Sequence, residues 1–162
     1  MIALKPYTSE YESTLAEYVI AFWDVHHSTV PLEEAKETLS DWTKGNHRLF
    51  AILRDQTIVG FIRTHNTSPT VCWIDDIYVD APFRSQGIAT EAIHQVETAL
   101  RAEGSRSFCM EVVPDNLPAM RLYHHLGYDR LSLITMRKDD DPFEAARTET
   151  IANLPMRVRK FD

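Results

Sequence analysis

Apolar residues recur along this chain with two different periods, and segments of the two kinds alternate. Runs in which every second residue is apolar, or in which apolar residues are continuous, indicate β-strands, whereas spacings of three and four indicate helices. Strands are therefore expected at residues 2–7, 47–53, 57–64, 71–79, 106–113 and 128–138. Helices are expected at residues 8–25, 31–44, 87–103 and 116–126. The polar residues 54–56 predict a turn that joins two of the strands into a β-hairpin.

The order of these elements, βααβββαβαβ, predicts an α/β (α+β) fold in which a mixed sheet carries helices on both faces. Beyond residue 138 the pattern weakens, and it indicates a turn at 139–142, a helix at 143–152 and a strand at 154–161. No internal repeat separates these pieces, so residues 1–162 are predicted to form a single domain with 139–162 as a C-terminal extension. This extension is expected to complete the sheet of its own chain, or that of a partner in a homodimer.

The connection between the strand at 71–79 and the helix after it has the clearest chemical implication. Asp80 and Pro82 break the strand, and the helix is predicted to begin at about Gln86 or Gly87. The first amides of a helix lack backbone partners and carry the positive end of the helix dipole, so an anion can bind there. Gly87 allows a close approach to the backbone, and Arg84 adds a planar donor that suits phosphate oxygens.

Two motifs give the chain a family resemblance. Arg84-Ser-Gln-Gly87-Ile-Ala89 resembles the coenzyme A signature of the GNAT N-acetyltransferases, Arg/Gln-x-x-Gly-x-Gly/Ala. Asn116-Leu-Pro-Ala-Met-Arg-Leu-Tyr123-His-His-Leu-Gly127-Tyr128 resembles the family's block Asn-x-x-Ala-x-x-Leu-Tyr-x-x-x-Gly-Phe/Tyr. The motifs and their flanking strand cover residues 71–128; the alternative is an ordinary strand, loop and helix followed by an Asn-capped helix. The resemblance implies a mostly antiparallel sheet with a splayed central strand pair.

The resemblance also implies a site for acetyl-coenzyme A. Its pantetheine arm would pair with the backbone at the end of the central strand, and its pyrophosphate would bind the amides of the turn, with Arg84 beside it. The residues implied for the cofactor are Ile77, Tyr78, Val79, Arg84, Ser85, Gln86, Gly87, Ile88, Ala89, Asn116 and Tyr123. Tyr123 matches the family's helix tyrosine, which can protonate the departing thiolate, or it is a core tyrosine. Asn116 would contact pantetheine, hold the strands apart, or only cap its helix.

Two neighbouring carboxylates, Asp75 and Asp76, lie in the central strand. Strict alternation places Asp75 with Trp73 and Ile77 on one face and Asp76 with Tyr78 on the other. Asp75 matches the position where polyamine acetyltransferases, with their Glu-Asp-Ile/Leu-Tyr/Phe-Val run, carry a base or an amine-binding acid.

The resemblance therefore implies that Asp75 acts as the catalytic base, directly or through a water, since aspartate is one methylene shorter than glutamate. It also implies that Asp75 and Asp76 bind the acceptor. The alternative for both is a cap or an ion pair. In this family the first two helices line the acceptor side, so Phe22 and Trp23, with His26 and His27, are candidates for an acceptor wall or for plain core packing.

Composition and charge exclude several other functions. With 17 Lys and Arg against 24 Asp and Glu, the net charge of -7 argues against nucleic acid or an anionic membrane as a partner. No stretch is long and apolar enough to predict a membrane span, and no signal peptide is visible, so a cytoplasmic location is expected. The seven histidines show no metal-ligand spacing, so no metal is predicted. Cys72 and Cys109 lie in apolar strands and are expected to be inert buried thiols.

These observations predict an acyltransferase that moves the acetyl group of acetyl-coenzyme A directly to a primary amine of a small cationic acceptor. One alternative keeps the chemistry and changes the acceptor to an aminoglycoside, an amino acid or a protein or peptide amine. Another is a non-catalytic acyl-coenzyme A sensor with a blocked acceptor cleft. The presence of both Tyr123 and Asp75 favours the enzyme.

Overall fold

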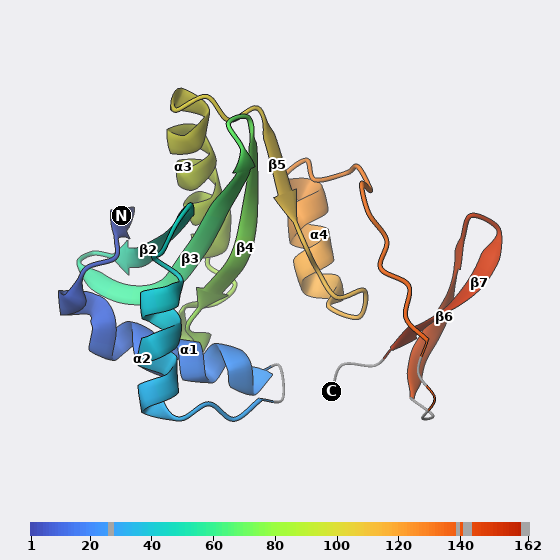
Figure 1. The fold of residues 1–162 in the computed structure, drawn as a ribbon, viewed down its shortest axis with the longest axis horizontal. Helices are drawn as coiled ribbons and strands as arrows, with labels where there is room; N and C mark the ends of the chain where they lie inside the picture. The colour runs from blue at the N-terminus through green and yellow to red at the C-terminus, as the bar shows by residue number, and fades with distance from the viewer. Residues whose placement is uncertain (26–27, 139, 141–143, 160–162) are drawn as a thin grey trace. The chain divides into compact units, whose positions relative to one another are not determined.

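The computed structural model describes residues 1–25, 28–138, 140 and 144–159 (Figure 1). It divides into two compact units, Met1–Glu111 and Val112–Asp162, and each unit has a sheet of its own. Among the described residues, no helix has both the length and the apolar character needed to span a membrane.

The first unit is built on a five-stranded sheet with the strand order β1-β2-β3-β4-β5 (Figure 1). Its strands are β1 (Ile2–Pro6), β2 (His47–Arg54), β3 (Thr57–Ser68), β4 (Val71–Val79) and β5 (Ser107–Met110). Its helices are α1 (Glu12–Val25), α2 (Leu32–Asp41) and α3 (Ile88–Ala102), with 3-10 turns η1 (Ser9–Tyr11) and η2 (Ala81–Phe83). Neighbouring strands are antiparallel except β4 and β5, which are parallel. The predicted mixed, mostly antiparallel sheet is confirmed.

Helices cover both faces of this sheet (Figure 1). Side chains of α1 and α2 pack on one face in a core cluster that includes Leu15, Val19, Leu39, Leu49, Ala51, Phe61 and Tyr78. On the opposite face α3 buries Ile88, Ala92, Ile93, Val96 and Leu100. These residues form one stripe because they recur every three or four positions, as a helix packed on a sheet requires.

The β2–β3 hairpin has the two-residue turn that its twist favours. Asp55 and Gln56 both have positive φ, at 48° and 71°, which is the backbone of a type I′ turn. The turn pairs Arg54 with Thr57, a bulge between Ile52 and Leu53 then shifts the register by one residue, and beyond the bulge His47 lies opposite His65. The predicted hairpin is therefore confirmed, with β3 extending four residues further than expected, to Ser68.

A β-bulge in β4 changes which side chains share a face. Arg63 of β3 lies opposite Asp76, but the next residue, Thr64, lies opposite Ile74, so Asp75 is an extra residue in the register. The predicted strict alternation is wrong at this point: a guanidinium nitrogen of Arg63 is 3.7 Å from Asp75 and another is 2.6 Å from Asp76. Both carboxylates therefore reach the face of the sheet that carries Arg63.

The strands β4 and β5 separate part-way along their length. They pair only from Val71 to Ile74 on β4 and from Ser107 to Met110 on β5. In the described part of the chain, the rest of β4, from Asp75 to Val79, has no strand partner on the β5 side. Figure 1 shows the two strands diverging, as the predicted splayed pair requires.

The second unit consists of α4 (Leu117–His125) and a hairpin of β6 (Ala145–Ile151) and β7 (Leu154–Arg159). The predicted helix at 143–152 is wrong over its described residues. Ala152 and Asn153 both have positive φ, so they form a two-residue turn that pairs the β-branched residues before it with β7. Residues 143, 160 and 161, the outer ends of these predictions, lie outside the described residues.

The strand predicted at 128–138 is also wrong, since these residues have no regular secondary structure. Their apolar side chains are largely exposed, and Leu131 is 84% accessible. Alternating apolar residues give a segment the capacity to form a strand, but a strand also needs a neighbour to pair with.

Candidate active site

Polar side chains extend the α1/α2 face of the sheet toward the β3–β4 turn. His65 of β3 lies between His47 of β2 and Trp73 of β4 in the register of the sheet. Its ring is 5.0 Å from the His47 ring and 6.4 Å from the Trp73 ring, measured between centroids. The His65 and Trp73 rings are nearly parallel, at 16°. The His65 ring is therefore held in place by neighbours on both adjoining strands.

The bulge residue Asp75 binds this histidine. Nδ1 of His65 is 2.8 Å from both carboxylate oxygens of Asp75. Nδ1 of His47 is further away, at 3.8 Å. The carboxylate is the more enclosed partner, because 13% of the Asp75 side chain is accessible against 23% of the His65 side chain.

Arg63 compensates the negative charge of this cluster. Its Nε donates a hydrogen bond of 2.6 Å to Asp76, and its guanidinium also lies over the Trp42 ring, 4.8 Å from the centroid. Trp42 is buried in the core cluster, so the contact fixes Arg63 against the sheet. Asp75 and Asp76 therefore form ion pairs with Arg63, which was one of the alternatives for these two residues.

A pocket opens over these residues. It is lined by Arg63, His65, Trp73, Ile74, Asp75, Asp76 and Glu111. His65 and Asp75 belong to its wall, whereas His47 does not. The pocket has an aromatic wall at Trp73 and several acidic groups, so it suits a small molecule with an amine.

The donors His47, His65 and Asp75 converge within 4.8 Å and form the candidate metal-ligand group of the described residues. Imidazole nitrogens and a carboxylate are ligand types that suit Zn²⁺. The His65–Asp75 hydrogen bond already engages two of the three donors, and the Arg63 guanidinium adds positive charge 3.7 Å from Asp75. Both features oppose a cation, and the cluster fits proton transfer better than metal binding.

The other end of β4 leads into the predicted anion site. Ser85 and Gly87 have positive φ, at 58° and 75°, and Gly87 is the N-cap of α3. A Cβ at Gly87 would meet no atom within 4 Å, so the space beside its backbone is open. Residues 85–87 are exposed, as binding to a large ligand requires, whereas the Ile88 side chain is buried and only its backbone remains available.

Arg84 and Tyr78 lie next to each other at this end of the strand. The Nε of Arg84 donates a hydrogen bond of 2.9 Å to the carbonyl of Val79, and its guanidinium lies 5.5 Å from the centroid of the Tyr78 ring. Burial, helped by the nearby Asp80, raises the pKa of Tyr78 above its ordinary value. The Tyr78 phenol therefore stays protonated and is not a base at neutral pH.

Asn116 and Tyr123 belong to the second unit, and their roles toward the cofactor stay predictions. Asn116 accepts a hydrogen bond of 3.2 Å from the amide of Ala119 and so caps α4. Tyr123 is half-buried, with its ring centroid 6.4 Å from that of Tyr128.

The aromatic residues of α1 join the core cluster. Phe22 and Trp23 are half-buried and pack against it, and the Phe22 ring is 5.8 Å from that of Phe61. The acceptor wall that they were predicted to form stays a prediction, and His26 and His27 lie outside the described residues.

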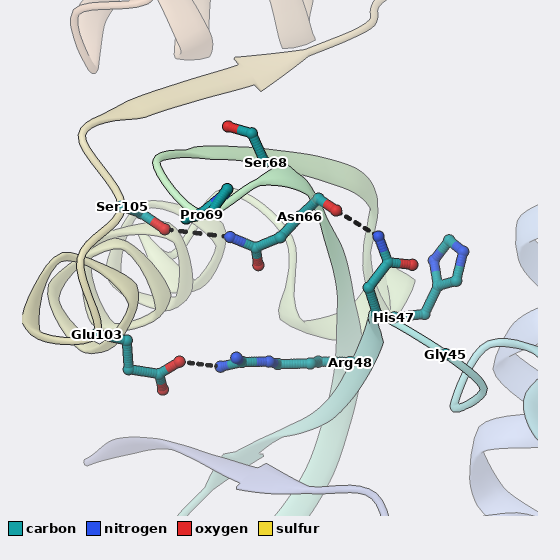
Figure 2. A pocket seen from close by; sticks show the side chains of 9 residues that line it. Gly45, His47, Arg48, Asn66, Ser68, Pro69, Glu103 and Ser105 are labelled. Carbon is teal, nitrogen blue, oxygen red and sulfur yellow. Dashed lines mark hydrogen bonds and ion pairs between the residues drawn. The ribbon is translucent and has the colours of Figure 1, made fainter.

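A second pocket lies near the start of β2 and the β3–β4 turn (Figure 2). Its polar side chains bind one another across it: Arg48 pairs with Glu103 at 2.5 Å, and the Asn66 amide donates to Ser105 at 3.3 Å. His47 lines this pocket (Figure 2), so the two neighbouring histidines border different cavities.

Comparison of this chain with known proteins identifies its family. The model of the acetyltransferase (GNAT) family matches residues 11–128. The chain belongs to this family. It is 26% identical over 97 residues to an uncharacterized N-acetyltransferase, YycN, of Bacillus subtilis (strain 168), and 28% identical over 106 residues to the mycothiol acetyltransferase of Corynebacterium glutamicum (strain R).

These alignments cover 57% and 65% of this chain but only 62% and 34% of the two relatives. Among solved structures, the GNAT fold is shared with AAC(6')-Iy in complex with the bisubstrate analog CoA-S-monomethyl-acetylneamine. That match has a TM-score of 0.70 at 17% identity and covers 86% of this chain and 99% of the other.

Sequence reasoning did not select Arg63 or His65. Arg63 lies in the strand predicted at residues 57–64, which was identified from its apolar residues alone, and His65 lies just beyond the predicted end of that strand. The pairing of β3 with β4 places His65 opposite Trp73, two residues from Asp75, but the register shifts between Asn66 and Ser68, so the sequence alone does not predict this pairing.

Proposed function

We propose that this GNAT protein transfers the acetyl group of acetyl-coenzyme A directly to a primary amine of a small cationic molecule. The observation that carries the proposal is that β4 contributes both to the pocket wall and to an open edge of the sheet. Its Asp75 lies in the wall of the pocket, and in the described part of the chain its next residues up to Val79 have no strand partner on the β5 side. The Val79 carbonyl accepts a hydrogen bond from Arg84, so the edge open to a ligand is the backbone before it. An extended ligand can add to such an edge as an extra strand, which brings its end toward the pocket.

The residues of this chain fit the cofactor. The backbone of Ile77, Tyr78 and Val79 would hold its pantetheine arm, and the open backbone of residues 85–89 would hold its pyrophosphate, with Arg84 and Asn116 as further contacts. When bound, the thioester supplies the acetyl group. No covalent intermediate on the protein is required if both substrates meet on one strand.

The remaining chemistry belongs to side chains. An amine attacks only when its nitrogen has a lone pair, so the pocket around Asp75 must accept a proton. The departing thiolate needs a proton in return, and Tyr123 would donate it. Phe22 and Trp23 would bound the acceptor on the α1 side.

The pocket also bears on the acceptor. Arg63 balances part of the charge of Asp75 and Asp76, while the exposed Glu111 adds a carboxylate to the same wall. A small cation therefore meets a moderate negative potential, which salt will screen. Aminoglycosides share this chemistry, as they carry several charged amines, and the AAC(6')-Iy structure was solved with an analog that joins coenzyme A to acetylneamine.

The proposal is tested by thiol release from acetyl-coenzyme A with a panel of acceptors: diamines and polyamines, aminoglycosides, amino acids and lysine peptides. We expect release with the small cationic amines, at a rate that falls as salt is raised. Release with peptides alone would contradict the acceptor class. Tight acetyl-coenzyme A binding without release in any panel member would favour the non-catalytic sensor.

A further inference from the structure

We infer that His65 is the group that accepts the proton of the acceptor amine and that Asp75 positions it. The inference rests on the proposed acetyl transfer, and it changes the role of Asp75 from base to partner of the base.

The hydrogen bond between the two side chains determines which ring nitrogen can act. Nδ1 of His65 is 2.8 Å from both oxygens of Asp75, so in the neutral ring Nδ1 carries the hydrogen and donates it to the carboxylate. The lone pair is then on Nε2, the nitrogen available to a substrate.

Accessibility favours the same assignment. Both residues line the pocket, but His65 is more accessible than Asp75, at 23% against 13% of the side chain. Asp75 is also paired with Arg63 at 3.7 Å, whereas Nδ1 of His47, at 3.8 Å, makes no hydrogen bond to it. The imidazole is therefore the more accessible of the two groups, and the carboxylate is already engaged by His65 and Arg63.

The ring is held rigidly enough for this role. His65 has an aromatic neighbour on each adjoining strand, His47 at 5.0 Å and Trp73 at 6.4 Å. The titratable and charged groups around it are Asp75 and Asp76 on β4, Arg63 on its own strand, His47 on β2 and Glu111 in the pocket wall. A fixed ring orientation is what proton transfer over hydrogen-bond distance requires.

In the proposed step the amine nitrogen uses its lone pair to form a C–N bond to the acetyl carbon. The C–S bond breaks, and its electron pair leaves with the sulfur. The proton lost by the nitrogen goes to Nε2 of His65, and the sulfur receives a proton from a separate donor. No oxidant, reductant or metal is needed.

The test compares pH profiles of kcat/KM for the parent, His65→Gln, Asp75→Asn and His47→Gln. Loss of the base should lower turnover of His65→Gln by roughly 10²- to 10⁴-fold and remove the acidic limb of the profile. Asp75→Asn should turn over more slowly and keep that limb. His47→Gln is the matched control, because His47 is also near Asp75 but borders the other pocket, and it should keep the limb.

Two further measurements separate catalysis from folding. Acetyl-coenzyme A affinity, from calorimetry, should be unchanged in His65→Gln, and added imidazole should restore part of the activity of His65→Ala. A limb that survives in His65→Gln but vanishes in Asp75→Asn would show that Asp75 is the base and overturn the inference, with acetyl transfer intact. A parent protein that releases no thiol with any amine would overturn the proposed function and the inference together.

Discussion

At the scale of single residues, the position of a side chain relative to the bulge decides its chemistry. Asp75 reaches His65 because β4 carries one residue more than β3 at this point. Cys72, three residues earlier, lies on the opposite face and is fully buried. Cys72 is therefore closed to solvent, whereas Asp75 is partly open to the pocket.

Burial, with a contribution from Asp75, raises the pKa of the Cys72 thiol to about 11 from an ordinary value of 9.0. Since the pKa is higher in the folded state, the neutral thiol contributes its full stability below pH 9, and that contribution is lost as pH rises from 9 through about 11. We predict that the free energy of unfolding of the parent falls over this range by roughly 2 to 3 kcal/mol more than that of Cys72→Ala.

Urea denaturation at several pH values measures this difference. Cys109→Ala is the control, since it keeps the buried thiol and should follow the parent. Parallel curves for the parent and Cys72→Ala would show that Cys72 does not titrate in this way. Both cysteines are free thiols; Cys72 is buried as predicted, whereas Cys109 is only partly buried, so the prediction of burial is wrong for Cys109.

At the scale of elements, β4 and the start of α3 connect the two halves of the site. The bulge directs Asp75 into the pocket, the unpaired end of the strand offers backbone groups, and Gly87 starts α3 with a left-handed backbone. The sequence predicted the strand, the turn and the helix, because their apolar periods and breaking residues are local. It could not predict the bulge, which depends on how β3 and β4 pair.

Gly87 offers a direct test of the anion site. A Glu or Gln at this position carries the same backbone strain at φ 75° and nearly the same volume, but only Glu places a negative charge at the start of α3. We predict that Gly87→Glu binds acetyl-coenzyme A at least about tenfold more weakly than Gly87→Gln, a difference of about 1.4 kcal/mol.

Calorimetric titration of both variants, with circular dichroism as a check of folding, measures this effect. Equal affinity in the two variants would mean that the pyrophosphate does not bind at this turn. The difference in affinity between the parent and Gly87→Gln measures the effect of the backbone strain and the added side-chain volume.

At the scale of the whole molecule, prediction from the sequence succeeded for the elements up to residue 126 and was mostly wrong for the segments after it. The five strands and three helices of the first unit, and α4 of the second, were all expected. Residues 128–138 were predicted as a strand but have none, because an alternating segment forms a strand only with a partner. Residues 145–151 were predicted as a helix but form a strand, because the turn at Ala152 and Asn153 pairs them with β7. The single domain and the homodimer stay predictions.

The site shows the same division. The turn at residues 84–89 and the acid at position 75 were predicted from local motifs, whereas His65 and Arg63 join the candidate site through contacts between strands. The sequence did not predict that Arg63 would pair with Asp76, because the two residues are thirteen positions apart and meet only when β3 pairs with β4. Acetyl transfer leaves direct evidence in the reaction products.

That evidence is the fate of the acetyl group after one turnover. Purified protein is mixed with acetyl-coenzyme A and the best amine of the panel, and the masses of the amine and of the intact protein are measured at successive times. Direct transfer predicts an amine heavier by one acetyl group, released thiol in equal amount, and a protein of unchanged mass throughout. An acetylated protein that forms before the product, or thiol release without an acetylated amine, would contradict it.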